Sequence, residues 1–441
     1  MPNVRVDKVF GVSKDMILSY LEREKVDGRF KTAIESDKHI VIYGSSKQGK
    51  SALILKHLRV DGAISVGCTP KTDTKSIYSS VLRQIGIQIE TSSIEKTGTT
   101  GSIAAKTSFK AKIPFFGEGQ VGLDAQVGGT TGRDITYKYV EFNLELAQDI
   151  SEILETAGFN KFIILDNFHY LNEEVQNNLA FDLRLFQEKG FRFIILGVWR
   201  EKNRLNQFNG DLVDRIIDIP VEPWTEGEFR DVIAKGCKKL NISIDKEIVS
   251  KIIAVSFGSI GIVQELCKEL CYASGFEEKE IVIQMGIQNI AYLDAAISVK
   301  VEEYSSRHLR ALESIANAGI QKDGLYMPYY VVRVLATMNV NDLMDGIARS
   351  YLQDAIRAIH HRRNDVRPSD MTYVLHGLAE MQIKKMVVPP LFDYDRVNSR
   401  LRIIDSTLFF FLSFKDKQEL LDEIPNPLEK VNSVDDESSS V

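Results

Sequence analysis

The sequence predicts an α/β fold, a parallel sheet covered by helices, followed by a helical lid and an all-α, winged-helix C-terminal domain. Short runs rich in β-branched residues occur at 39–43, 161–166 and 191–197. Continuous apolar runs of this kind are typical of strands buried on both faces of a parallel sheet. Segments with helical spacing separate these runs, and helical spacing dominates from Trp224 onward. Strands that alternate with helices favour a doubly covered parallel sheet.

The first run leads directly into a glycine-rich loop. Residues 44–51 match the pattern Gly-x-x-x-x-Gly-Lys-Ser, and residues 52–58 have the character of a helix. A glycine loop between a strand and a helix is the setting of a phosphate-binding P-loop, and it argues against the alternative, a Gly/Lys-rich surface turn. The predicted nucleotide-binding residues are Gly44, Ser45, Ser46, Lys47, Gln48, Gly49, Lys50, Ser51 and Ala52.

Each residue type in this loop has a physical reason. Gly44 and Gly49 allow backbone angles that other residues avoid, so that the loop N–H groups can surround phosphate oxygens. The helix that starts near Lys50 directs its positive end at the same anion. Lys50 is expected to neutralise the β- and γ-phosphates, and the Ser51 hydroxyl to bind Mg²⁺. The loop therefore predicts a nucleotide site.

Length and composition indicate an ordinary globular chain. Its 441 residues suggest two to three domains, with 44% hydrophobic and 26% charged residues. The longest apolar runs, 191–199 and 408–414, are too short to span a bilayer, and the N-terminus has no apolar signal core. The four cysteines show no metal-binding spacing. We expect a reducing, cytoplasmic location without membrane contact.

The expected organisation has four parts. Residues 1–222 form the nucleotide-binding α/β domain, 223–298 a helical lid, 299–415 a winged-helix-like domain and 416–441 an acidic, partly disordered tail. The Gly/Ser/Thr-rich stretch 91–136 is expected to be an insertion that carries a β-hairpin, with alternating pieces at 108–113 and 120–125. This insertion either contacts a partner or is a mobile surface hairpin.

A later strand is expected to supply the metal partner. The run 161–165 ends in Asp166 and Asn167, and an acid in this place after a P-loop is the candidate for organising Mg²⁺. Asn172 is expected to cap the next helix, and the last strand of the sheet is expected at 216–221.

The second half is predicted to be mostly helical. A capping box at Thr225–Glu228 begins helices expected near 226–240, 245–256 and 260–275. Further helices are followed by two candidate strands, 386–388 and 401–404, and this order describes a winged helix.

In this order of elements the chain resembles an AAA+ or STAND-type P-loop ATPase, near origin-recognition-like and defence-associated ATPases. The resemblance implies ATP and Mg²⁺ as ligands, with Lys50 and Ser51 at the phosphate and metal positions and Asp166 as the acidic metal partner. It also places Arg215, before the last strand, where relatives reach the γ-phosphate of a neighbouring subunit, which would imply a homo-oligomer. The alternative is a surface arginine paired with Asp211 or Asp214.

Three departures weaken the expectation of fast hydrolysis. Asn167 stands where many relatives have a catalytic glutamate, and an amide can position water but cannot take its proton. Glu173, Glu174 or His169 are possible substitutes. The strand that ends at Gly197 lacks the usual polar sensor, for which Arg200 or Asn203 could serve. The lid helix that opens at 258–263 lacks the family's sensor arginine.

Three functions therefore remain open. The first is a slow regulatory or antiviral-defence ATPase switch that signals to a protein effector. The second is a DNA-binding loader or regulator of replication or transposition, with DNA contacts through residues 357–402. The expected groove helix, 370–382, contains no Arg or Lys, and the net charge of −6 disfavours a generally basic DNA binder. The third is a nucleotide-binding scaffold with little turnover.

Overall fold

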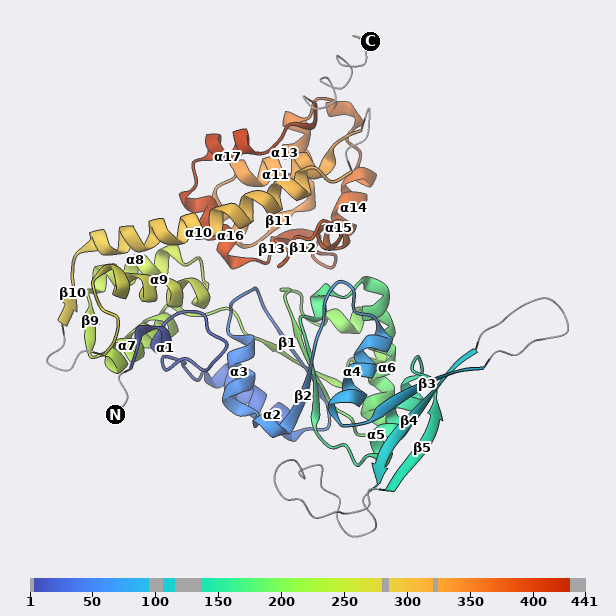
Figure 1. The fold of residues 1–441 in the computed structure, drawn as a ribbon. Helices are drawn as coiled ribbons and strands as arrows, with labels where there is room; N and C mark the ends of the chain where they lie inside the picture. The colour runs from blue at the N-terminus through green and yellow to red at the C-terminus, as the bar shows by residue number, and fades with distance from the viewer. Residues whose placement is uncertain (1–3, 95–105, 116–135, 280–284, 320–323, 429–441) are drawn as a thin grey trace, which may run out of the picture.

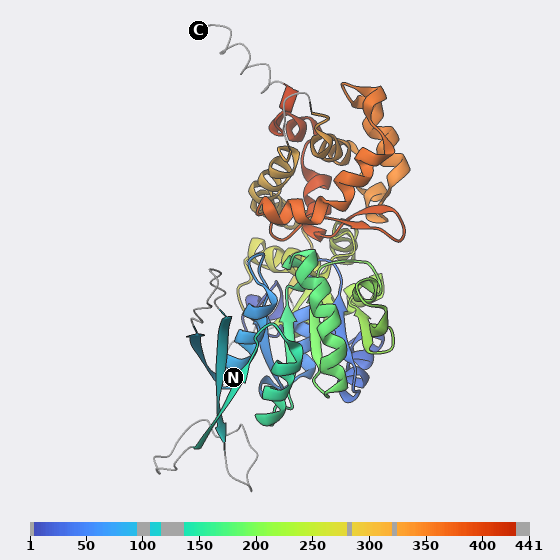
Figure 2. The same cartoon turned by 90° about the vertical axis from the view of Figure 1, so that its right-hand side faces the viewer.

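The computed structural model describes residues 4–94, 106–115, 136–279, 285–319 and 324–428. It contains a central α/β domain, a small helical lid beside it and a C-terminal domain above it (Figure 1). The long helix α10 (Ile290–Ala316) joins the lid to the C-terminal domain. In the view turned by 90°, the C-terminal domain lies directly above the central domain (Figure 2).

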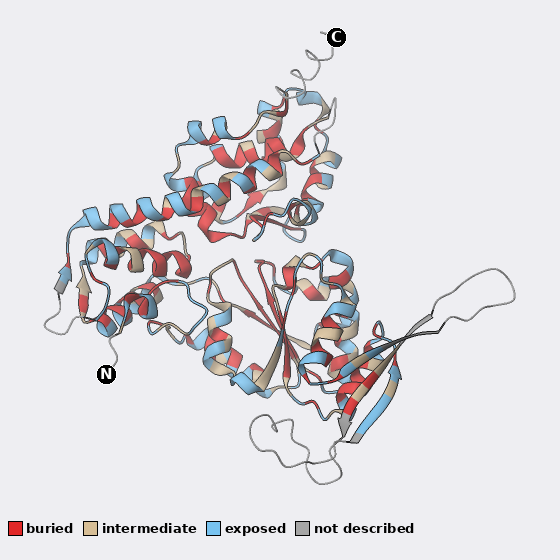
Figure 3. Ribbon diagram, in the orientation of Figure 1, coloured by how far each residue is buried: buried red, intermediate tan, exposed pale blue. Residues whose placement is uncertain are grey.

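The central sheet is parallel, as predicted, and has five strands. Its order is β2-β6-β7-β1-β8, so that the P-loop strand β1 lies between β7 and β8. The strands are β1 (His39–Tyr43), β2 (Ala63–Gly67), β6 (Phe162–Asp166), β7 (Phe193–Gly197) and β8 (Ile216–Pro220). Strands β1 and β7 are buried along their whole length (Figure 3). Such strands need helices on both faces of the sheet.

Two separate apolar layers cover the faces of this sheet. One contains Phe30, Ala33 and Leu53, from α2 (Arg29–Glu35) and α3 (Lys50–His57). The other is formed by α4 (Thr74–Gln84), α5 (Ala147–Thr156) and α6 (Glu173–Glu188). Asn172 caps α6 by accepting a hydrogen bond from Val175 N–H, as predicted. Short turns of helix complete the domain: η1 (Glu24–Gly28), η2 (Val60–Gly62), η3 (Phe168–Tyr170), η4 (Arg204–Gln207) and η5 (Gly210–Leu212). The first helix of the chain, α1 (Val6–Val9), instead packs into the apolar core of the lid.

The insertion forms a separate sheet of three antiparallel strands. They are β3 (Gln88–Ile94), β4 (Lys106–Phe115) and β5 (Thr136–Phe142), in the order β3-β4-β5. The piece expected at 108–113 lies within β4, whereas the piece expected at 120–125 lies outside the described residues. The sheet extends away from the central domain on the side opposite the lid (Figure 1).

The lid consists of α7 (Glu226–Leu240), α8 (Lys246–Val255) and α9 (Ile260–Ala273), with a two-stranded sheet of β9 (Ile242–Ile244) and β10 (Met285–Ile287). Thr225 and Glu228 form the predicted capping box at the start of α7. The boundary expected near residue 299 falls inside α10, so the lid and the C-terminal domain share one continuous helix.

The C-terminal domain contains a three-stranded sheet of order β11-β13-β12 among helices, which is a winged-helix arrangement. Its elements are α11 (Met327–Thr337), α12 (Val340–Met344), β11 (Ile347–Ala348), α13 (Arg349–Ile359), η6 (Arg363–Asp365), α14 (Pro368–His376), α15 (Leu378–Lys384), β12 (Phe392–Asp395), β13 (Arg400–Ile403), α16 (Ser406–Phe414) and α17 (Lys417–Glu423).

Two local predictions in this domain were wrong. Residues 386–388 are not a strand, because Met386 has φ +59° and Val387 N–H bonds back to Gln382, so this segment ends helix α15. The strand that pairs with β13 is β12 instead. The single groove helix expected at 370–382 is divided into α14 and α15 at Gly377.

Candidate functional site

The glycine loop leaves β1 at its carboxyl end and enters α3. Gly49 has φ +89°, a left-handed conformation, and precedes the first helical residue, Lys50. Gly44 has φ +153°, and a Cβ placed there would lie 2.7 Å from a methyl carbon of Val221. Both glycines are therefore required by the backbone, and the loop amides open toward the N-terminal end of α3.

Lys50 lies inside its own loop. Its Nζ donates hydrogen bonds to the carbonyl oxygens of Gly44 at 2.8 Å and Ser45 at 2.7 Å. Burial lowers the pKa of Lys50 to about 8, against the opposing effects of Glu222 and Asp166. A partly desolvated ammonium group at this position is a ready counter-charge for phosphate.

Asp166 ends strand β6 on the same edge of the sheet, and Ser51 stands in the first turn of α3. Burial raises the pKa of Asp166, while the Asn167 N–H and Lys50 act in the opposite direction. One carboxylate and one hydroxyl near a phosphate loop match the way Mg²⁺ binds nucleotides, which leaves most ligands to phosphate and water. Among the described residues no group of three or more His, Cys, Asp or Glu side chains could hold a metal by itself.

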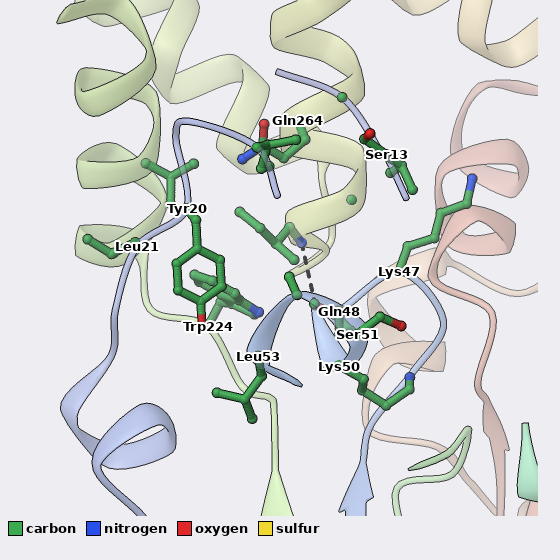
Figure 4. A pocket seen from close by; sticks show the side chains of 18 of the residues that line it. Ser13, Tyr20, Leu21, Lys47, Gln48, Lys50, Ser51, Leu53, Trp224 and Gln264 are labelled. Atoms are coloured by element: carbon green, nitrogen blue, oxygen red, sulfur yellow. Dashed lines mark hydrogen bonds between the residues drawn. The ribbon is translucent and has the colours of Figure 1, made fainter. Parts of the chain in front are cut away.

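A cavity of about 200 Å³ opens on the other side of the loop (Figure 4). Its walls come from the N-terminal segment, the P-loop and the lid, and they include Tyr20, Leu53, Trp224 and Gln264. The Nε1 atom of Trp224 is buried and has no hydrogen-bond partner among the described residues. An apolar pocket with an unpartnered N–H is suited to a nucleobase or a ribose.

The sequence did not identify these cavity residues. Tyr20 is oriented by a hydrogen bond to Asp27 of 2.5 Å, and Asp27 also lies 2.7 Å from His57 Nε2. Arg23 stacks over Trp224 at 3.6 Å from the ring centroid. These contacts join the lead-in segment, α3 and the residues after β8, and no local pattern predicts such a meeting.

The lid closes against the loop at the beginning of α9. A Cβ on Gly261 would lie 2.6 Å from Lys47 Cβ and 2.9 Å from the Lys47 carbonyl oxygen. The Gln48 side chain donates to the Gly258 carbonyl at 3.3 Å. The lid is therefore in direct backbone contact with the P-loop.

The C-terminal domain contacts the same loop from above. The Ser46 N–H donates to the Ile404 carbonyl at 3.1 Å, and the Ser406 hydroxyl donates to the Ser46 carbonyl at 3.1 Å. The Ser406 hydroxyl also lies 2.9 Å from the hydroxyl of Ser259, at the start of α9. Three parts of the chain thus meet at Ser46.

Arg200, one of two candidate sensors, reaches the loop. Its Nε donates to the Ser45 hydroxyl at 2.9 Å and lies 3.2 Å from Glu222, and its Nη1 donates to the Met344 carbonyl at 3.1 Å. Glu222 in turn accepts the Ser45 N–H at 2.8 Å. Asn203, the other candidate, instead donates its backbone N–H to Asp218.

The possible substitutes for a catalytic glutamate are placed differently. His169 is buried, its Nδ1 accepts the Val198 N–H at 3.3 Å, and burial lowers its pKa to about 3. It is therefore neutral at pH 7 and a very weak base. Glu173 is exposed and paired with Arg396, and Glu174 is exposed.

Arg215 lies at the opposite end of the sheet from its own P-loop. Its carbonyl accepts the His39 N–H at the amino end of β1. Its guanidinium donates to Gln187 and lies 3.0 Å from Glu188, rather than pairing with Asp211 or Asp214. Arg215 thus does not reach the nucleotide site of its own chain, and a finger role requires a neighbouring subunit.

The winged-helix hairpin of β12 and β13 packs against the central domain. Arg396 pairs with Glu173 on α6 through two contacts of 3.2 Å, and Asp393 accepts from Arg204 at 2.9 Å. Arg400 and Arg402 bond to carbonyls of 345–346. Within 357–402, the exposed basic side chains away from the hairpin are Arg362, Arg363, Arg367, Lys384 and Lys385.

Among the described residues, no helix combines the length and the apolar character that a bilayer crossing requires.

The five-stranded parallel sheet and the Gly44–Ser51 loop at the carboxyl end of β1 define a P-loop NTPase fold. Residues 33–205 match the family model described as an AAA domain, and they include both the P-loop and Asp166. This part of the chain is therefore similar to an AAA domain and has the P-loop NTPase fold. The match does not reach the lid or the C-terminal domain.

Comparisons over the whole chain are more distant. The Walker-type ATPase PABY2304 of Pyrococcus abyssi is 12% identical with a TM-score of 0.46, covering 94% of this chain and 99% of that chain. Aeropyrum pernix ORC1, in complex with DNA, is 12% identical with a TM-score of 0.40, covering 92% and 93%. The Thermotoga maritima RuvB Holliday junction branch migration motor is 11% identical with a TM-score of 0.38, covering 90% and 96%. No curated protein matches the sequence.

Proposed function

We propose that this protein is a Mg²⁺-dependent, slow AAA+/STAND-like ATPase that acts as a nucleotide-driven regulatory or defence switch and signals to a protein effector. The observation that carries the proposal is the position of Ser46. Both of its backbone polar groups are hydrogen-bonded to the C-terminal domain, at Ile404 and Ser406. A phosphate that needs the loop amides competes with the C-terminal domain for the same group, so nucleotide binding and domain contact are coupled.

The chain's own residues would act as follows. Lys50 would exchange the carbonyls of Gly44 and Ser45 for the β- and γ-phosphates. Ser51 and Asp166 would hold Mg²⁺, which neutralises charge on the phosphate oxygens when it is bound. Asn167 would hold water by its amide without removing a proton. Slow turnover follows from that missing base.

The lid and Arg200 would transmit the change. Arg200 contacts the loop at Ser45 and the C-terminal domain at Met344. A phosphate bound at the loop attracts this guanidinium and so weakens its hydrogen bond to the Met344 carbonyl. The two domains would separate in response, exposing the hairpin of β12 and β13 to an effector.

The primary test measures nucleotide binding and domain contact together. Calorimetry with Mg²⁺ and a non-hydrolysable ATP analogue should show binding that Lys50→Ala abolishes. A pair of fluorophores, one on α6 and one on α15, should report an increase in separation on binding. Ser406→Ala should lower the nucleotide concentration needed for this change, whereas Ser369→Ala, an exposed serine of the same domain, should not. Binding without any change in separation would refute the switch.

A homo-oligomer is proposed from Arg215. An arginine finger supplied by a neighbour raises turnover by roughly 10³ to 10⁵ in P-loop enzymes. The rate per subunit should rise with protein concentration and fall in Arg215→Ala. Arg184→Ala is a matched control, because Arg184 shares the partner Glu188 with Arg215. A rate that does not depend on concentration and is equal in both variants would refute the finger, and no turnover at all would favour the scaffold alternative.

The second candidate function, a DNA-binding loader or regulator, is favoured by the winged-helix sheet β11-β13-β12 and by the exposed basic side chains of residues 362–367. Backbone contacts of this kind weaken steeply with salt. Duplex DNA binding at low salt, weakened in Arg363→Gln, would support this candidate, and its absence at low salt would exclude it.

A further inference from the structure

Asp405 is a buried carboxylate that the proposed chemistry does not use. It is only 1% exposed and lies immediately before α16. Its Oδ1 accepts hydrogen bonds from the Thr407 N–H at 3.0 Å and the Thr407 hydroxyl at 2.7 Å. Its Oδ2 lies 2.6 Å from Arg307 Nη2, yet it accepts no directed hydrogen bond from any described residue. Buried carboxylate oxygens normally accept hydrogen bonds, and burying one that is stabilised only by a nearby charge costs folding free energy. Such a group is therefore a candidate for a functional role.

Asp405 stands between the two residues that bind the P-loop. Ile404 and Ser406, its chain neighbours, bond to the N–H and the carbonyl of Ser46. Asp405 also opposes the effect of burial on the pKa of Lys47, the next loop residue, which indicates that the carboxylate and the loop interact.

This end of the loop is the γ-phosphate end. A P-loop lysine reaches the β- and γ-phosphates, and here Lys50 Nζ lies at Gly44 and Ser45, directly before Ser46. The helix start at Gly49 and Lys50 receives the phosphates nearer the ribose. A third phosphate would therefore be added on the side of Ser46 and Asp405, whereas a diphosphate would leave that side open.

Arg307 supplies the opposite charge from α10. Its Nη2 contacts Asp405 and donates to the Thr407 hydroxyl at 2.6 Å, and its other two guanidinium nitrogens have no protein partner among the described residues. Its side chain is 33% exposed, so it keeps access to solvent and to ions. The lid helix has no sensor arginine of its own, and Arg307 comes from the next helix of the chain.

We propose that Asp405 and Arg307 form a charge pair that sets the preference of the P-loop for triphosphate over diphosphate. This inference rests on the proposed nucleotide binding. A γ-phosphate at Ser46 would lie beside the negative Asp405 carboxylate, and this repulsion lowers the affinity for a triphosphate. Arg307 would exchange its contact with Asp405 for one with the γ-phosphate, and this attraction raises the affinity for a triphosphate. A diphosphate has no third phosphate near the pair, so its affinity is almost unaffected.

The experiment compares two ligands across matched variants of the full chain. Calorimetry gives the Kd of Mg²⁺-loaded AMPPNP and of Mg²⁺-loaded ADP, and the ratio of the two is the readout. Asp405→Asn should shift the ratio at least about tenfold toward the triphosphate, and Arg307→Gln at least about tenfold toward the diphosphate. The interaction between charges a few ångströms apart in a partly buried site exceeds the energy that a tenfold change in Kd requires.

Two controls separate charge reading from general damage. Arg310→Gln removes an exposed arginine one turn further along α10, and Asp395→Asn removes a buried carboxylate that pairs with Arg402. Neither should change the ratio. Arg307→Lys keeps the charge and should retain most of the preference for one ligand over the other. If Asp405→Asn fails to fold, the difference in Kd ratio between Arg307→Gln and Arg307→Lys tests the inference instead.

The outcomes are distinguishable. Opposite shifts in the two variants would support the inference. Unchanged ratios, or equal weakening of both ligands, would overturn it while leaving the proposed function in place. A wild-type chain that binds neither ligand would overturn the proposed function itself, and this inference with it.

Discussion

The contact between the lid and the P-loop can be tested by adding one methyl group. Gly261→Ala places a Cβ 2.6 Å from Lys47 Cβ and 2.9 Å from the Lys47 carbonyl oxygen, where ordinary contacts are 3.4–4 Å. Neither atom can move away by a side-chain rotation, so α9 and the loop must separate. Overpacking of this kind costs about 1–3 kcal/mol.

A gain in helix propensity partly offsets that cost. Alanine is favoured over glycine inside a helix by about 1 kcal/mol. The net loss is therefore about 0–2 kcal/mol, and the middle of this range, about 1 kcal/mol, corresponds to roughly fivefold more frequent opening. Hydrogen–deuterium exchange measures this directly, and the amides of the P-loop and of the first turns of α9 should exchange about fivefold faster.

The chain offers a matched control. Gly227 is the second residue of α7, as Gly261 is of α9, but the nearest atom to a Cβ there is 4.0 Å away. Gly227→Ala should leave exchange at the P-loop unchanged. Equal exchange in the two variants would refute the argument that the lid rests on the backbone of Lys47.

Three further predictions follow from single contacts. His39 is fully buried and neutral, and burial lowers its pKa to about 4 from an ordinary 6.5. The imidazole binds a proton more readily in the unfolded chain than in the folded one. The free energy of unfolding should therefore have its full value above pH 6.5 and fall by about 3 kcal/mol toward pH 4. Urea titrations should find a smaller loss in His39→Gln. Arg204→Met should disturb the docking of the C-terminal domain more than Arg396→Met, because the Arg204–Asp393 ion pair is mostly buried and the Arg396–Glu173 pair is exposed. Equal fluorophore separation in the two variants would contradict this prediction. Asn167 has φ +59°, so Asn167→Ala should cost about 1 kcal/mol of stability and lower turnover, whereas unchanged turnover would exclude a role in holding water.

The sequence by itself determined the elements whose signals are local. The Gly44–Ser51 loop, the strand that ends at Asp166 and the capping box at Thr225 are all specified by residues within a few positions of one another. Their patterns follow from backbone sterics and hydrogen bonding, which act over one turn or one strand. The parallel sheet followed in turn from the alternation of strands and helices.

Only the tertiary structure decided what lies around the loop. Ser46 meets Ser406 across 360 residues, and Arg200 meets Met344 across 144. The local sequence around a serine or an arginine does not predict such distant partners, because these contacts depend on how three folded units pack against one another. The prediction of a strand at 386–388 failed for a related reason: Met386 takes a left-handed conformation that ends α15, and this outweighs the β propensity of the valines. Local sequence could thus specify where a phosphate would bind, whereas the packing of distant segments determined which groups compete with it.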